Sequence, residues 1–83
     1  MSEATPRVQF LRLPEVQHDS GVAKSTLYAR IADGLFPRPV RIGPRSVAWP
    51  AHEIAAINRA RLAGQSERDI ADLVSSLQAK RSK

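Results

Sequence analysis

Two prolines within four residues, FPRP at 36–39, separate a helical pattern from a strand pattern in this chain of 83 residues. Proline lacks the amide hydrogen that a helix interior requires, and it restricts the residue before it. A helix that begins near Lys24 must therefore end near Asp33. Gly34 suits the position after the last turn, because glycine adopts the left-handed conformation that closes many helices.

Two short helices joined by a tight turn are predicted before these prolines. Pro14 suits the first turn of a helix that buries Val16, and the turn residues DSG at 19–21 lead into the second helix. At 100° per residue, one side of the second helix carries Ala23, Leu27 and Ile31, and the other carries Ser25, Tyr28, Ala29 and Ala32. The second helix is therefore expected to place one side on the core and the other in solvent.

A two-stranded hairpin is predicted after the prolines. Val40 and Ile42 alternate with a polar residue, Val47 and Trp49 alternate with small residues, and Gly-Pro at 43–44 supplies a turn. A hairpin of this size is marginal alone, so we expect it to pack on the helices. The predicted fold class is mainly α with a small two-stranded β-hairpin wing, which is a winged helix-turn-helix.

The remainder of the chain predicts two more helices. One starts after Pro50 and stops at Gly64, and the other follows a capping pattern at 66–69. The last helix has an apolar stripe made of Ile70, Leu73, Val74 and Leu77. This stripe either closes the core or pairs with a second copy of the chain. We expect a flexible arm at 1–9, a winged helix-turn-helix domain at 10–63 and an amphipathic C-terminal helix at 64–83.

The charge of the chain favours a polyanionic partner, nucleic acid above all. The formal net charge is +5, and five basic residues fall between Lys24 and Arg45 against one acid, Asp33. The sequence contains no cysteine and no apolar stretch near the roughly 20 residues that a membrane span needs. We therefore expect a cytoplasmic protein associated with the nucleoid.

Enzyme chemistry is not indicated by the titratable residues. His18 and His52 lack the spacing of a metal cluster, and the serines have no neighbouring base and acid in the sequence. Glu53 lies near a helix start, where compensation of the helix dipole is a sufficient reason for a carboxylate. We expect no enzymatic activity, no metal and no cofactor.

The outward side of the second helix carries groups that can bind DNA. Ser25 and Thr26 can donate hydrogen bonds to phosphates or bases, and Lys24 adds a cation where a phosphate can lie. Tyr28 lies one turn further on the same side, with packing on the hairpin as its alternative. We interpret these four residues as DNA contacts.

Four arginines extend the candidate surface. Arg30 contacts either a phosphate or an internal acid such as Glu53, and the sequence leaves both alternatives open. Arg38 flanks the prolines, Arg41 should point away from the apolar face of the hairpin, and Arg45 lies at the hairpin tip. From the tip, a guanidinium can enter a minor groove or pair with a phosphate.

The segment STLYARIADGLFPRPVRIGPRSVAWPAHEI, residues 25–54, resembles the AlpA family of phage and prophage regulators. These are small winged-helix proteins similar to MerR-like and excisionase-like domains, and the resemblance covers about residues 10–62. It implies sequence-specific DNA binding, with Ser25, Thr26 and Tyr28 at contact positions of the recognition helix and Arg45 and Ser46 at the wing. Ala23 departs from the family, which usually has a capping residue at this helix start; its absence costs about 1 kcal/mol.

The resemblance implies transcriptional control, with an excisionase-like factor that bends DNA as an alternative. A third hypothesis is a protein-interaction module whose important surface is the last helix. The expected partners are double-stranded DNA, a second copy of the chain through that helix as one alternative, and an integrase or RNA polymerase.

Overall fold

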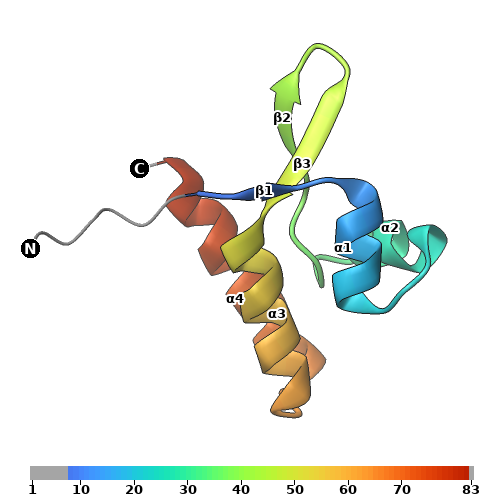
Figure 1. Cartoon of the computed structure of the whole chain (residues 1–83). Coiled ribbons are helices and arrows are strands. Elements are labelled where there is room, and N and C mark those ends of the chain that lie inside the picture. Colours follow the sequence, from blue (N-terminus) through green and yellow to red (C-terminus); the bar gives the residue numbers. More distant parts are fainter. Residues whose placement is uncertain (1–7, 83) are drawn as a thin grey trace, which may run out of the picture.

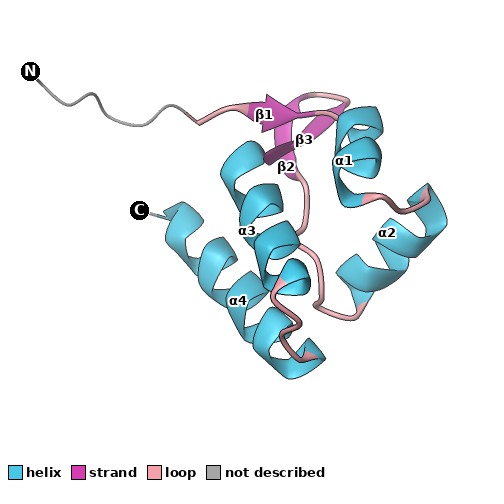
Figure 2. Ribbon diagram, turned by 60° about the horizontal axis from the view of Figure 1, so that its bottom comes forward, coloured by secondary structure: helices cyan, strands magenta, loops and turns pink. Residues whose placement is uncertain are grey.

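The structure is a computed structural model that describes residues 8–82. The elements in chain order are β1 (Phe10–Leu11), α1 (Leu13–Ser20), α2 (Lys24–Ala32), β2 (Val40–Gly43), β3 (Ser46–Pro50), α3 (Ala51–Leu62), α4 (Glu67–Ala79) and a 3-10 turn, η1 (Lys80–Ser82). Helices α3 and α4 pack side by side, α1 and α2 lie beyond α3 on the other side from α4, and the β2–β3 hairpin projects from the body (Figures 1 and 2). Most of the predicted arm, residues 1–7, lies outside the described residues.

The sheet has three strands, so the prediction of two strands was wrong. All pairs are antiparallel in the order β1-β3-β2, and β1 joins the base of the hairpin through Phe10 opposite Pro50 and Leu11 opposite Trp49. Leu11 is 9% exposed, so the third strand also contributes to the core. A strand of two residues is too short to show alternation in the sequence, which is why only the structure reveals it.

A single apolar core joins the sheet to all four helices of the described chain. Val16 of α1, Leu27 of α2 and Ile54 and Ile57 of α3 are each at most 1% exposed, and they belong to one core cluster with Trp49 of β3. These are the inward positions that helical spacing predicts for the first two helices. The outer sides of α1 and α2 therefore remain in solvent.

The apolar stripe of α4 contributes to this same core. Ile70 and Val74 are 1% and 2% exposed, and Leu73 and Leu77 are partly buried against the cluster. Ser66 caps the start of the helix, and its hydroxyl accepts a hydrogen bond from the Asp69 amide at 3.1 Å. The stripe is therefore covered within one copy of the chain.

Buried and exposed side chains do not alternate along β3 in the way that the sequence predicts. Val47 is 39% exposed, and its neighbour Ala48 is fully buried beside the equally buried Trp49. At its base β3 lies between β1 and β2 and against the helices, so consecutive residues are covered on both faces. Toward its tip the hairpin extends beyond the body, which leaves Ile42 and Val47 in solvent (Figure 1).

Within residues 8–82, no helix combines the length and the apolar character needed to cross a membrane.

Candidate nucleic-acid interface

Helix α2 presents the polar side that the sequence predicts. Lys24, Ser25 and Thr26 at its first turn are exposed, whereas Leu27 is fully buried and anchors the helix. The helix starts after Ala23, whose side chain makes no capping hydrogen bond, and it closes before Gly34 with a positive φ of 76°. The amide groups of the first turn therefore have no cap from the side chain of Ala23, and three exposed polar side chains lie in the same turn.

Tyr28 packs on the hairpin, which is one of the two alternatives that the sequence left open, and its contact with DNA stays a prediction. Its ring meets the ring of Trp49 edge-on, with centroids 6.5 Å apart and an interplanar angle of 67°. The residue is nevertheless 39% exposed. Tyr28 thus links α2 to the base of the hairpin, and part of its side chain stays exposed.

The hairpin carries two exposed arginines near its turn. Arg41 and Arg45 are both exposed, and Ser46 is half-buried. The Arg41 Nη2 group donates to the Pro44 carbonyl at 3.2 Å, which ties the strand to the turn. No such contact is recorded for Arg45 among the described residues, so its guanidinium is available at the hairpin tip.

Arg30 lies in the last turn of α2, and Arg38 lies between α2 and the hairpin. Arg30 is half-buried, and Glu53, the internal acid considered as its partner, is bound by Arg81. Glu53 pairs with Arg81 and not with Arg30, so the pairing of Arg30 with Glu53 was a wrong alternative. Arg38 is exposed, and it lies in the segment between α2 and β2.

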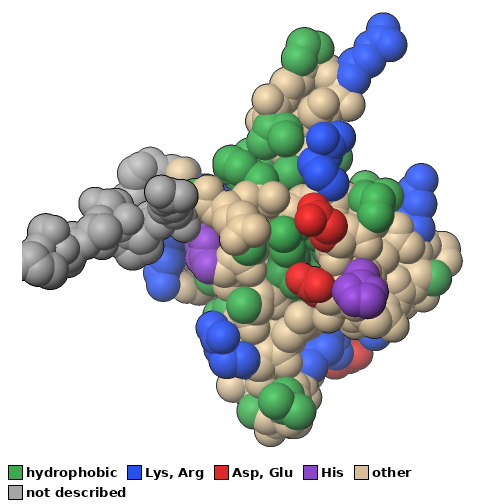
Figure 3. All heavy atoms as spheres, in the orientation of Figure 1, with side chains coloured by type: hydrophobic (Ala, Val, Ile, Leu, Met, Phe, Trp, Pro, Cys, Tyr) green, Lys and Arg blue, Asp and Glu red, His purple; other side chains and the backbone are tan. Residues whose placement is uncertain are grey.

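The hairpin and α2 both carry basic side chains. Figure 3 shows Lys and Arg side chains at the tip and near the base of the hairpin and beside α2, and others over the part of the body that α3 and α4 form, whereas the acidic side chains most visible on this face lie over α1. The acids of α1 are Glu15 and Asp19, both exposed. The candidate interface is thus the outer side of α2 together with the hairpin, and α1 borders it with negative charge.

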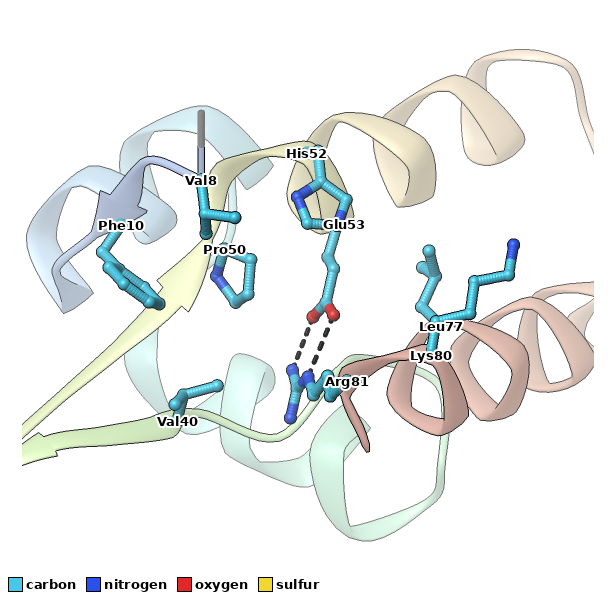
Figure 4. Close-up of a pocket in the computed structure, with 9 residues that line it drawn as sticks. All are labelled: Val8, Phe10, Val40, Pro50, His52, Glu53, Leu77, Lys80 and Arg81. Carbon is cyan, nitrogen blue, oxygen red and sulfur yellow. Dashed lines mark hydrogen bonds and ion pairs between the residues drawn. The ribbon is translucent and has the colours of Figure 1, made fainter. Parts of the chain in front are cut away.

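The sequence did not reveal an ion pair between the buried Glu53 and Arg81. Glu53 is 1% exposed, and its two carboxylate oxygens accept from Nε of Arg81, at 2.9 Å, and from Nη2. The pair forms one wall of a hollow of about 330 Å³ (Figure 4). Helix-dipole compensation alone does not explain a carboxylate this deeply buried, and a partner 28 residues away leaves no local signal in the sequence.

The hollow itself is mainly apolar, and it reaches the hairpin at Val40, the first residue of β2. Val8, Phe10, Val40 and Pro50 form one side of it, and His52, Leu77 and Lys80 border the ion pair on the other (Figure 4). Within residues 8–82, no group of three or more His, Cys, Asp or Glu side chains is arranged to hold a metal ion.

Comparisons with known proteins agree with the resemblance found in the sequence. The family described as "Prophage CP4-57 regulatory protein (AlpA)" matches residues 9–61. A relative from Enterobacteria phage P4, "Uncharacterized protein ORF88", is 44% identical over 57 residues, which cover 69% of this chain and 65% of the relative. The match thus spans less than two thirds of the relative's length. No solved structure matches this chain. Because the family match covers β1 through nearly all of α3, including α2 and the hairpin, the chain belongs to the AlpA family of prophage regulatory proteins.

Proposed function

We propose that this chain is a sequence-specific DNA-binding regulator of transcription. In this proposal α2 lies in a major groove and the β2–β3 hairpin contacts the flanking backbone or minor groove. The observation that carries the proposal is the outward placement of Lys24, Ser25 and Thr26 on a helix whose Leu27 is fully buried, next to a projecting hairpin with exposed arginines. Contacts with an integrase or RNA polymerase stay predictions.

The first turn of α2 has the chemistry that phosphate and base recognition requires. The hydroxyls of Ser25 and Thr26 can donate to or accept from base edges, and Lys24 supplies a positive charge. Because Ala23 leaves the helix start uncapped, the amides there can donate to a phosphate. Ala29 and Ala32 are exposed and small, so the helix can approach base edges and touch a thymine methyl group.

Selection of bound sequences from a random DNA pool tests this proposal directly. A preferred sequence should emerge, and its affinity should fall as salt rises, with a logarithmic slope of about −0.9 for each neutralised phosphate. Ser25→Ala should relax preference at particular bases. Arg45→Ala should weaken binding to all sequences and reduce the slope by about one phosphate.

Arg68→Ala is the matched control for loss of one positive charge. Arg68 is exposed on α4, and α3 lies between α4 and α2 (Figure 2). Its replacement should leave sequence preference unchanged and affect the salt slope less than Arg45→Ala does. Equal, salt-insensitive binding by the wild type and by Arg45→Ala would refute a DNA-contacting hairpin.

One observation supports the excisionase-like alternative, in which the protein bends DNA. Ile42 and Val47 are 43% and 39% exposed on the projecting part of the hairpin. Apolar side chains on such elements can insert between base steps of the minor groove and kink the duplex. A circular-permutation assay should then show a bend that decreases in Ile42→Ser and Val47→Ser; a straight duplex with the wild type would exclude this role.

A further inference from the structure

The segment that joins α2 to β2 is held by side chains from distant elements. This wing linker, residues 36–39, contains two prolines and lies in no helix or strand. The Pro37 carbonyl accepts from Nε1 of Trp49 at 2.8 Å. The Arg38 amide donates to Oε1 of Gln78 at 2.9 Å, and the Arg38 carbonyl accepts from Nη2 of Arg81 at 2.8 Å. Both backbone groups of Arg38 are therefore fixed by the C-terminal part of the chain.

The carboxylate of Glu53 orients the guanidinium group of Arg81. The guanidinium binds the carboxylate through two nitrogens, which is the planar two-bond geometry that arginine favours. Because Glu53 is 1% exposed at the start of α3, it provides an anchor within the core. The same Nη2 group then reaches the Arg38 carbonyl, so the position of the wing linker is set from α3 through Arg81.

We propose that Gln78 and Arg81 are positioning residues for the DNA-binding surface. The wing linker sets how the hairpin stands relative to α2, and the exposed Arg38 side chain projects from the residue whose backbone they hold. This inference rests on the proposed function. It also goes beyond the family match, because residues 9–61 include Glu53 but neither Gln78 nor Arg81.

Gln78→Ala is the variant that isolates this role. It removes the acceptor for the Arg38 amide and leaves the buried ion pair intact, whereas Arg81→Ala also strips Glu53 of its partner. Gln78→Glu keeps an acceptor oxygen and serves as the conservative rescue. Ser75→Ala, on the exposed side of the same helix, is the control.

Hydrogen exchange of the Arg38 amide measures the contact in the free protein. The amide should exchange roughly tenfold faster or more in Gln78→Ala than in the wild type, because its hydrogen bond is lost. Gln78→Glu and Ser75→Ala should exchange at close to the wild-type rate. Unchanged exchange in Gln78→Ala would overturn the proposal.

A double-mutant cycle with Arg38→Ala measures the consequence for DNA. In the wild-type background, Arg38→Ala should weaken binding to the selected sequence by roughly five- to tenfold. In the Gln78→Ala background the same change should weaken binding by less than about threefold, because a misplaced Arg38 side chain contributes less to binding. If the wild type binds DNA and the losses in affinity from Arg38→Ala and Gln78→Ala simply add in the double variant, the positioning role is wrong. The proposed function is not affected by that result. Failure of the wild type to bind any selected DNA would refute the proposed function and this role with it.

Discussion

Replacing Arg81 with alanine should destabilise the whole domain, because it leaves a buried carboxylate without a partner. Glu53 is 1% exposed and would lose both of its hydrogen bonds, while the Arg38 carbonyl would lose one. Removing one member of a buried pair costs about 3–5 kcal/mol. The Arg81 side chain is 21% exposed, so water can replace part of the interaction and the lower end, about 3 kcal/mol, is expected.

This loss is large relative to the stability that a chain of this length can have. At 0.05–0.15 kcal/mol per residue, 83 residues give a free energy of unfolding of roughly 4–12 kcal/mol. A loss of about 3 kcal/mol should lower Tm by roughly 12–24 °C. Urea unfolding followed by Trp49 fluorescence gives the free energy, and calorimetry gives Tm.

Two further variants separate the ion pair from a general effect of charge. Arg68→Ala removes an exposed arginine from the first turn of α4 and should change the free energy of unfolding by no more than about 0.5 kcal/mol. Replacing Glu53 and Arg81 together with methionine removes the charge and keeps apolar volume, so most of the stability should return. A loss below about 1 kcal/mol in Arg81→Ala, or a double variant as unstable as the single, would refute the reasoning.

Three other substitutions test the packing and the helix ends. Ala23→Ser supplies the missing cap of α2 and should raise the free energy of unfolding by about 1 kcal/mol in urea titrations; no increase would mean that the helix start needs no cap. Trp49→Phe leaves the buried Pro37 carbonyl without its donor and should cost about 1–3 kcal/mol, measured by circular dichroism, whereas an unchanged value would show that this bond contributes little. Ile70→Ala should cost about 2–5 kcal/mol in thermal melts, and a loss under 1 kcal/mol would indicate that α4 is not part of the core.

Local rules of the sequence were sufficient for the helices near the candidate interface. The prolines at 37 and 39 and the glycine at 34 limit α2 by backbone chemistry alone, and helical spacing correctly assigns Leu27 to the core and Ser25 to solvent. The DNA contacts derived from this placement stay predictions. The placement itself depends on residues within one or two turns of each other, which is why it can be read from the chain.

Features that join distant parts of the chain could not be read in the same way. The strand β1 forms because Leu11 pairs with Trp49 of β3. The burial of Ala48 depends on the strands that lie on either side of β3. The partner of Glu53 was missed because an arginine near the end of a helix is equally well explained by the helix dipole. For β1 and for Glu53 the residues in contact are tens of residues apart in the sequence, and only the fold brings them together.

The C-terminal helix has a practical consequence for how this protein is divided into fragments. A fragment cut at the limits of the family match would end at residue 61, before Ile70, Val74 and Arg81. It would expose the face of α3 that α4 covers and leave Glu53 uncompensated in what remains of the interior. Chimaeras that exchange α2 and the hairpin between relatives should therefore keep residues 51–82 together as one scaffold.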